Sequence, residues 1–400
     1  MKIRISENRI KSINSFIQAL IISTGFLAAI LSLRFHVESG FIFLSATLVL
    51  AILLLEILVT SNIYMPKKFI WFVGHMILFC MLTYLLNGSA TSINLIYMFY
   101  YCILAYYVMS LKNDTVMLLK YMIYISSLSI FAIGSIFGDM DLGRAYSMLP
   151  GMIAVLVFWK FYKDKMNIPI FICSMISLIS MGKLIMTANR GVIIAIVFTL
   201  LVITLNNFDK NGKKIKASAL KVILYFVIGI LICIVVTNFE QVLDVLLQLA
   251  KSVNIDAFFL EKFKIYLELG DVTNGRTDIY EEAIAGIIHS PIWGHGIGVF
   301  HYDAATNTSY YPHNFVLQLL YDGGILLGLS FVVKALRITF AIVIGSIKEK
   351  DDFCLVVFMV CTSIPQVSFS SNIWMVPAFW MLFAVYDKLQ KKKKINRVVQ

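Results

Sequence analysis

Charged residues are scarce in this sequence. Asp, Glu, Lys and Arg make up 14% of its 400 residues, against about 25% in an ordinary soluble domain. Apolar residues make up 60%, which is more than a water-soluble protein of this size could bury. A disordered chain would show the opposite balance. The composition therefore excludes a soluble enzyme and a disordered chain, and it predicts an integral membrane protein.

Metal-type cysteine spacing is also missing. The cysteines lie inside apolar runs without C-x-x-C spacing, which predicts small buried side chains and neither a disulfide framework nor a zinc site. No small-residue cleavage site bounds the first apolar run, so we expect a retained span. No internal repeat is visible, which weakens an inverted-repeat transporter. The cysteines are Cys80, Cys102, Cys173, Cys233, Cys354 and Cys361.

Apolar runs of membrane-spanning length recur along the chain. They predict an all-α polytopic membrane protein with about twelve transmembrane helices. Nine spans are expected in 1–238, a large outer loop in 239–312, a re-entry helix and three spans in 313–388, and a basic tail in 389–400. The expected spans are 12–33, 40–60, 69–86, 92–111, 116–137, 146–162, 168–188, 191–206, 219–238, 323–346, 353–369 and 373–388.

The distribution of lysine and arginine predicts the orientation. If the amino terminus is cytoplasmic, most of the 34 Lys and Arg residues fall in inner segments, as the positive-inside rule requires. Both termini are then expected inside and the loop 239–312 outside. The net charge of +11 belongs to these inner segments and to a tail that is expected to be a retention signal or a lipid contact, and it does not indicate nucleic-acid binding.

The outer loop is too long for a simple connector. Amphipathic patterns predict helices over 240–252, 276–290 and 310–324. The sequence GHGIGVF (294–300) predicts a tight glycine-rich turn, because no βαβ unit surrounds it as a nucleotide fingerprint would require. We expect this loop to cap a cavity that faces outside.

Two arginines and one histidine are expected at the same outer level of the membrane. Arginine forks bind phosphate oxygens and stay charged, and a neutral histidine accepts a proton from a hydroxyl. Arg190, Arg276 and His313 would therefore suit a lipid diphosphate. Each also has a structural alternative: an interface anchor for Arg190, an ion pair with Asp278 or Glu282 for Arg276, and a helix cap for His313.

Other polar residues are weaker candidates. Lys183 lies inside an expected span, where it could hold a pyrophosphate or extend to the interface. The turn Asp139-Met140-Asp141 resembles a metal-binding D-x-D, but acids in turns are common. Three loop histidines have no metal-like spacing and are expected to be solvated. They are His289, His295 and His301.

Five motifs in a fixed order resemble the O-antigen ligase/polymerase family, over roughly residues 180–330. Each motif alone is weak, and the combination is specific. Asn189 replaces a common serine, and Asp322 stands where the family often has Glu; both changes keep the polar character. The motifs are NRG (189–191), GRTDIY (275–280), SPIWGHGIGVF (290–300), HNFVLQLL (313–320) and YDGGILLG (321–328).

The resemblance implies a type-C membrane glycosyltransferase in the bacterial inner membrane, with its active site facing the periplasm. Its donor would be an undecaprenyl-diphosphate-linked oligosaccharide and its acceptor a glycan, without a metal or another cofactor. By motif, Arg190 and Arg276 would bind the donor diphosphate and His313 would activate the acceptor hydroxyl. The substrate-binding candidates are Arg190, Arg276, Asn314, Lys183 and Asp322.

The resemblance covers two activities. A polymerase joins lipid-linked repeat units, and a ligase transfers the finished chain to lipid A-core. We favour a polymerase, with a chain-length regulator as an expected partner, because polymerases are the more diverse members. A lipid-linked oligosaccharide flippase fits the span count but not the clustering of candidates at one face. A structural or receptor protein would require these residues to be dispensable.

Overall fold

A computed structural model gives the fold, and the chain it describes forms helices and no strand. The all-helical fold class is therefore confirmed for these residues. Much of the expected span 40–60 and all of 219–238 lie outside them. The structure describes residues 6–35, 45, 47–54, 65–87, 97–132, 142–186, 190–209, 212, 239–252, 261, 264–265, 276–302, 309–343 and 346–399.

Three helical stretches of the described chain are long and apolar enough to cross a membrane. They are α4 (Lys67–Asn87), the run Phe315–Ile342 and α17 (Lys350–Phe369). Helices α4 and α17 coincide with expected spans, whereas Phe315–Ile342 joins the expected re-entry helix 310–324 to the expected span 323–346. Together the three stretches are consistent with a helical membrane protein. The total of about twelve spans stays a prediction.

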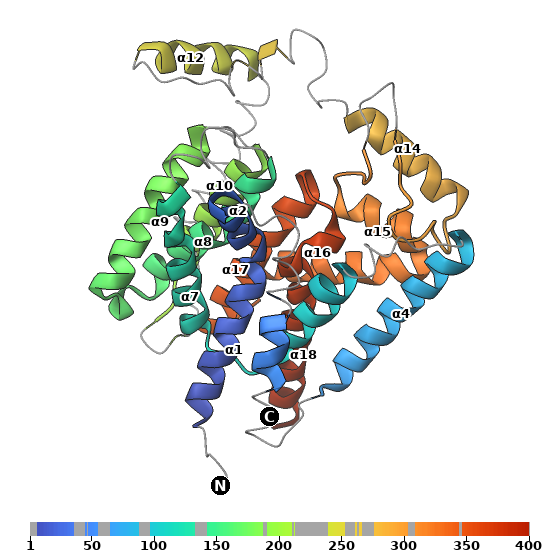
Figure 1. Cartoon of the computed structure of the whole chain (residues 1–400), viewed down its shortest axis with the longest axis horizontal. Helices are drawn as coiled ribbons and strands as arrows, with labels where there is room; N and C mark the ends of the chain where they lie inside the picture. The colour runs from blue at the N-terminus through green and yellow to red at the C-terminus, as the bar shows by residue number, and fades with distance from the viewer. Residues whose placement is uncertain are drawn as a thin grey trace.

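Shorter apolar helices pack around these stretches (Figure 1). Their positions follow the expected spans, because apolar runs between polar breaks form helices that must satisfy their own backbone groups. The bounds are π-helix Met98–Leu104, α6 Ala105–Ser110, α7 Thr115–Ser127, 3₁₀-helix Leu128–Ala132, α8 Leu142–Phe161, 3₁₀-helix Lys163–Lys165, α9 Ile168–Met186, α10 Arg190–Leu205, α15 Phe315–Gly323, π-helix Gly324–Gly328, α16 Leu329–Val343, 3₁₀-helix Ile373–Met375 and α18 Pro377–Val399.

The first expected span, 12–33, is not one continuous helix. It is split at Ser23 into α1 (Glu7–Ile22) and α2 (Thr24–Phe35), which are bent by 62°. The Thr24 hydroxyl bonds back to the carbonyls of α1 and contacts the Tyr100 hydroxyl at 3.0 Å. Such side-chain bonds compete with the backbone ladder and bend helices.

Helix α17 forms the centre of the bundle. Its residues 353–363 are all buried, and it packs against α8, α10 and α18. A helix that is apolar on every side belongs in the interior of a bundle. Helix α4, in contrast, lies at the edge of the bundle and exposes much of its surface.

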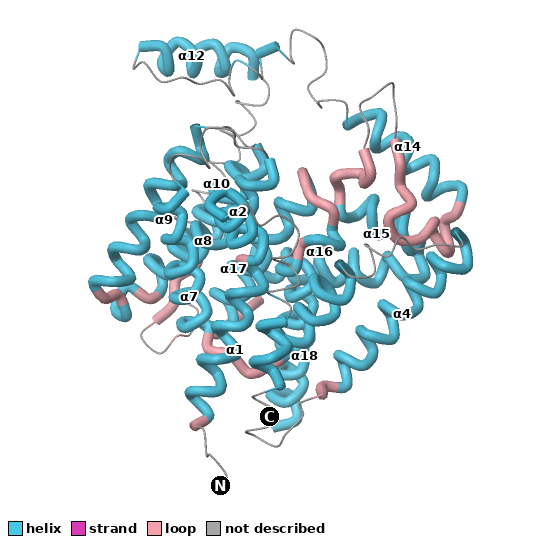
Figure 2. Tube along the Cα trace, in the orientation of Figure 1, coloured by secondary structure: helices cyan, strands magenta, loops and turns pink. Residues whose placement is uncertain are grey.

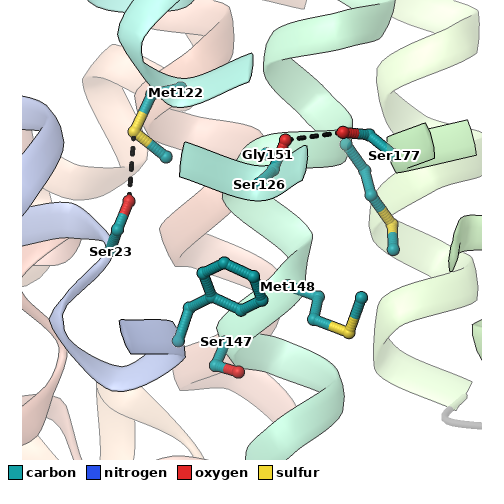
Figure 3. Close-up of a pocket in the computed structure, with 9 residues that line it drawn as sticks. Ser23, Met122, Ser126, Ser147, Met148, Gly151 and Ser177 are labelled. Carbon is teal, nitrogen blue, oxygen red and sulfur yellow. Dashed lines mark hydrogen bonds between the residues drawn. The ribbon is translucent and has the colours of Figure 1, made fainter. Parts of the chain in front are cut away.

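Small residues allow the close packing of α7 and α8. A Cβ on Gly151 would overlap the Ser126 side chain, so only glycine lets the two helices approach. Figure 3 shows the Ser126 hydroxyl bonded to the Ser177 hydroxyl at 2.6 Å, and the Ser23 hydroxyl bonded to the Met122 sulfur at 3.5 Å. The cavity between them, about 10 Å³, has room for about one water.

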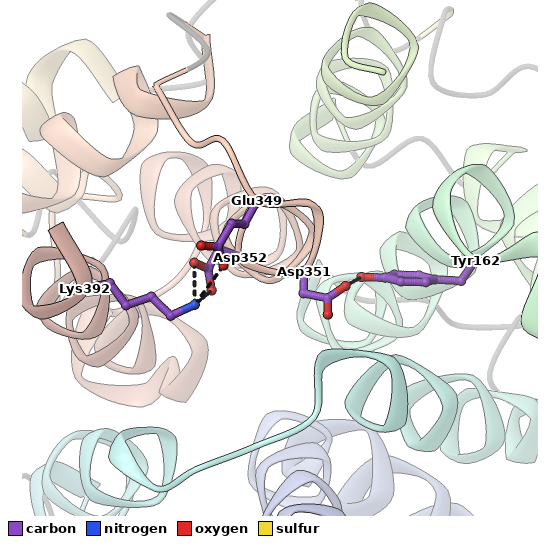
Figure 4. A network of polar contacts seen from close by, with 5 residues as sticks. All are labelled: Tyr162, Glu349, Asp351, Asp352 and Lys392. Carbon is purple, nitrogen blue, oxygen red and sulfur yellow. Dashed lines mark hydrogen bonds and ion pairs between the residues drawn. The ribbon is translucent and has the colours of Figure 1, made fainter. Parts of the chain in front are cut away.

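The expected basic tail, 389–400, begins as part of a helix. Helix α18 continues to Val399. The Lys392 ammonium bonds to Asp352 at 2.8 Å and to Glu349 at 3.2 Å, which ties α18 to the start of α17 (Figure 4). In the same figure the Tyr162 hydroxyl donates to Asp351 at 2.5 Å.

The helices expected in the long loop are present as α12 (Phe239–Ser252) and α14 (Arg276–His289). Both lie at the end of the molecule opposite the two termini (Figure 1). Because both termini lie at the same end, this arrangement agrees with an even number of membrane crossings between the amino terminus and the carboxyl terminus.

Candidate functional site

The glycine-rich turn fastens the segment after α14 to α15 (Figure 2). Gly294, Gly296 and Gly298 have φ angles of 72°, 96° and 71°, which favour glycine. The backbone N–H of Gly296 donates to the Asp322 carbonyl at 2.9 Å. A Cβ on Gly294 would lie 2.6 Å from the Tyr321 carbonyl oxygen. The expectation of a tight turn is confirmed.

His295 is not the solvated histidine that its spacing suggested. It is half-buried, its Nε2 lies 2.8 Å from the Gly286 carbonyl oxygen, and its ring stacks on Tyr321 at 4.5 Å. The Asn87 side chain donates to its carbonyl at 2.7 Å. His295 therefore links α4, α14 and α15. His289 and His301 are exposed, as expected.

Helix α15 begins with a side-chain cap from Asn314. The Asn314 Oδ1 accepts hydrogen bonds from the backbone N–H of Val316 and Leu317 at 2.9 and 3.3 Å. Asparagine is a preferred residue at this position. The cap is thus Asn314, and the alternative that His313 caps the helix is wrong.

The backbone of His313 is strained. Its φ is 51°, and it is the one non-glycine residue of the described chain with a positive φ. Such a conformation costs about 1–3 kcal/mol and persists where the surroundings hold it. The strain, together with the cap that follows, fixes the direction of the imidazole.

The His313 ring lies in a half-buried polar setting. Its centroid is 4.4 Å from that of Tyr311, and its Nε2 is 3.3 Å from the Ser309 hydroxyl. Nδ1 is buried and makes no hydrogen bond of good geometry with the described residues. The Ser309 hydroxyl also bonds to the Tyr311 carbonyl at 2.7 Å. That shorter bond uses the hydroxyl proton, which leaves the Ser309 oxygen able to accept a hydrogen bond from Nε2–H.

Burial and a neighbouring cation keep His313 neutral. Burial lowers its pKa to about 4, the positive charge of Arg276 lowers it further, and a backbone contact with Ser370 acts in the opposite direction. The ring therefore holds a free lone pair at neutral pH.

Arg276 is the first residue of α14 and is half-buried. Its charge acts on His313 and on Tyr311, whose pKa is raised by burial and lowered in part by this guanidinium. Within the described chain Arg276 forms no ion pair, so the pairing with Asp278 or Glu282 is not found there. Its charge is therefore available to an anion.

A series of contacts connects the backbone at Arg190 to the residues around His313, although the Arg190 side chain lies outside the described part. Arg190 begins α10, and a Cβ on Gly191 would overlap the Tyr146 hydroxyl. That hydroxyl accepts from Ser370 Oγ at 3.3 Å, and the Ser370 carbonyl accepts from the Tyr311 hydroxyl at 3.0 Å. A chain of contacts thus links the start of α10 to the residues around His313.

The remaining candidates lie elsewhere or are undescribed. Asp322 is buried and accepts a hydrogen bond from the Trp374 indole at 2.7 Å. It lies nine residues beyond His313, or roughly 13 Å along a helix axis. The structure therefore does not bring it to His313. The Lys183 side chain and the turn Asp139-Met140-Asp141 lie outside the described residues.

No group of three His, Cys, Asp or Glu side chains in the described chain could hold a metal ion. Its cysteines carry free thiols, and Cys102, Cys354 and Cys361 are buried as expected. Cys80 and Cys173 are half-buried, and Cys233 lies outside the described part.

Three polar neighbours of His313 were not anticipated, namely Ser309, Tyr311 and Ser370, and neither was Tyr146, which contacts Ser370. Tyr311 stands two residues before His313 in YYPHN, so its proximity could have been expected from the motif. Tyr146 and Ser370 come from distant segments, and only the packing of α8 and α17 brings them here.

Residues 175–332, about two fifths of the chain, match the family model described as O-antigen ligase. This segment contains Arg190, Arg276 and His313. No curated protein and no solved structure shows a significant match to the chain. Members of the matched family are glycosyltransferase-like enzymes that act on lipid-linked glycans in membranes. The match over residues 175–332 supports the resemblance to the O-antigen ligase/polymerase family that the motifs indicated.

Proposed function

We propose that this protein is a polymerase that joins lipid-diphosphate-linked glycan repeat units. The observation that carries the proposal is the meeting of Arg276, which has no ion pair in the described chain, with a strained, neutral His313. A cation without a counter-ion suits a diphosphate leaving group, and a neutral imidazole suits a hydroxyl nucleophile.

The reaction is a single displacement. The acceptor hydroxyl oxygen attacks the anomeric carbon of the donor, while the bond from that carbon to the diphosphate oxygen breaks. The hydroxyl proton moves to the neutral imidazole of His313, and the lipid diphosphate leaves with the bonding electrons. Attack from the face opposite the leaving group inverts the anomeric centre. Arg276 and Arg190 stabilise the charge that develops on the diphosphate.

The other candidates take supporting roles. Lys183 is proposed as a further cation for the diphosphate. Asn314 acts through its cap, which holds α15 and therefore the His313 backbone. Asp322 acts through the Trp374 indole and the glycine-rich turn, and it does not touch the donor.

The proposed setting is the bacterial inner membrane, with both termini in the cytoplasm and Arg276 and His313 at the periplasmic face. The donor is proposed to be undecaprenyl-diphosphate-linked oligosaccharide, and a chain-length regulator is a proposed partner. The excess of basic residues in the expected inner segments supports this orientation.

A ligase is the second candidate, because the matching family model bears the description O-antigen ligase. The two activities use the same donor chemistry and differ in the acceptor. A host that lacks the gene distinguishes them: loss of a polymerase leaves single repeat units on the core, and loss of a ligase leaves bare core with long glycan on its lipid carrier.

The test is complementation of such a host, read by electrophoresis of the surface glycan. His313→Ala should abolish complementation while membrane protein level stays normal. His289→Ala is the matched control, because His289 is an exposed histidine of the same segment, and it should complement. Arg276→Gln should fail, and Arg276→Lys should restore part of the activity by keeping the charge without the fork.

Full complementation by His313→Ala would show that this residue is not the base. If Arg276→Gln also complemented, a transporter would become the better explanation of the fold.

A further inference from the structure

A large groove lies on the side of the bundle between the start of α4, helix α16 and helix α18. Its volume is about 1060 Å³. Its lining includes Lys67 and Lys68 at the start of α4 and Ile325 of the π-helix Gly324–Gly328, which leads into α16. Arg276 and His313 are not among its lining residues. We call it the basic groove.

The charges in the basic groove are unbalanced. Six basic side chains and one acidic side chain line it. Five of the basic ones form no ion pair within the described chain. These five are Lys67, Lys68, Lys334, Arg337 and Lys391.

The other two charged side chains are already engaged. The Lys388 ammonium donates to the Leu111 carbonyl at 2.7 Å and to Asn113 at 3.2 Å. The Asp387 carboxylate accepts from the Tyr106 hydroxyl at 2.6 Å. Asp387 also interacts electrostatically with Lys334, so it offsets one of the six positive charges, and the groove keeps an excess of positive charge that attracts an anion.

The wall of the groove on α16 is apolar. Ile325, Leu329 and Val333 recur every four residues and share one helical face. Ile325 is 57% exposed and Leu329 is 40% exposed. From Ile325 to Arg337 the helical run rises roughly 18 Å, close to the ~15 Å depth of one leaflet of the hydrocarbon core.

We propose that the basic groove binds a phospholipid with an anionic head group. The phosphate lies among Lys67, Lys68 and Arg337, and an acyl chain lies along Leu329 and Val333. The charge cluster explains the preference for an anionic head group, because basic pockets between membrane helices at the membrane surface attract such lipids. The apolar wall is about as long as one leaflet is deep, so it matches an acyl chain, and this is why we infer that the ligand is a lipid.

The test is native mass spectrometry of the full-length protein in detergent, with phosphatidylglycerol or phosphatidylcholine of identical acyl chains. The wild type should bind phosphatidylglycerol more tightly than phosphatidylcholine. Each cation near a membrane surface changes affinity about fivefold. The triple variant Lys67→Gln, Lys68→Gln and Arg337→Gln should therefore bind phosphatidylglycerol about a hundredfold more weakly, with phosphatidylcholine binding unchanged.

The matched control removes three exposed lysines outside the groove: Lys160→Gln, Lys163→Gln and Lys165→Gln. It should bind phosphatidylglycerol as the wild type does, and circular dichroism should show that both triple variants keep their helix content. Equal binding of the two lipids by the wild type would overturn the proposal. So would equal losses in the two triple variants, because the effect would then be one of total charge.

Discussion

The low pKa of His313 makes a sharp prediction about the pH dependence of glycan transfer. At pH 5.5 a ring with a pKa of about 4 is about 97% neutral, whereas a ring with the ordinary value of 6.5 is about 9% neutral. Because kcat/KM reports the free enzyme, it should stay near its plateau at pH 5.5. A tenfold loss is expected if the base is an ordinary histidine.

The donor should shift this pKa when it binds. One negative charge at roughly 6 Å contributes about 2.8 kcal/mol at an effective dielectric of 20, which raises a pKa by about 2. The acid limb of kcat, which reports the enzyme–donor complex, is therefore expected near pH 6, well above the limb of kcat/KM. The separation of the two limbs is the signature of a base whose partner Arg276 is neutralised by the donor diphosphate.

The assay is initial-rate transfer by the purified protein in detergent, with a synthetic lipid-diphosphate-linked repeat unit, from about pH 4 to pH 8, which covers about two pH units on each side of the expected kcat limb and reaches the expected kcat/KM limb. His289→Ala should reproduce both limbs. A kcat/KM limb near 6.5 would refute the reasoning, and so would coincident limbs for kcat/KM and kcat.

Three substitutions test the packing around His313. Gly191→Ala should lower the free energy of unfolding, measured by thermal unfolding, by about 1–3 kcal/mol, because the added Cβ would overlap the Tyr146 hydroxyl. The control is Gly74→Ala, whose Cβ would meet nothing within 4 Å. This control should not destabilise the protein in the same assay. Tyr311→Phe loses its hydrogen bond to a loop carbonyl and should cost about 1 kcal/mol while kcat falls only in part, since the ring stays. Asn314→Ala should cost about 1 kcal/mol through the lost helix cap, and Asn314→Asp should restore most of that stability; equal losses for Ala and Asp would contradict the cap.

The same lowered pKa affects stability. The folded value of His313 lies below the unfolded one, so unfolding takes up a proton as the pH falls. Above about pH 6.5 the ring is neutral in both states and this effect is absent; as the pH falls towards 4, proton uptake by the unfolded chain lowers the stability of the folded protein by up to about 3 kcal/mol. The thermal midpoint of His313→Gln should therefore fall less steeply than that of the wild type across this interval.

Periodicity and end signals were enough to locate most of the described helices. The amphipathic pattern of 276–290 placed the start of α14 at Arg276, and the apolar run 69–86 became α4. These are local signals, because backbone capping and membrane burial act within one segment. The fixed order of the five motifs also indicated the family whose model residues 175–332 match.

Tertiary contacts explain what the sequence did not predict. The break at Ser23 is accompanied by a contact between Thr24 and Tyr100, and the adjacent Gly25 is only a weak local signal for it. The role of Asp322 depends on the Trp374 indole, which comes from a segment 52 residues away. Pairwise contacts of this kind leave no periodic pattern in one sequence.

The positive φ of His313 connects the fold to the chemistry. Left-handed backbone is costly for a histidine, and the energy to hold it comes from neighbours on both sides: the Asn314 cap on α15 and the Ser309 contact to its ring. If the strain served only to turn the chain, glycine would serve better, since it adopts this φ at no steric cost. His313→Gly should therefore leave thermal stability equal or higher while it removes transfer activity. Lower stability together with retained activity would make His313 a packing residue.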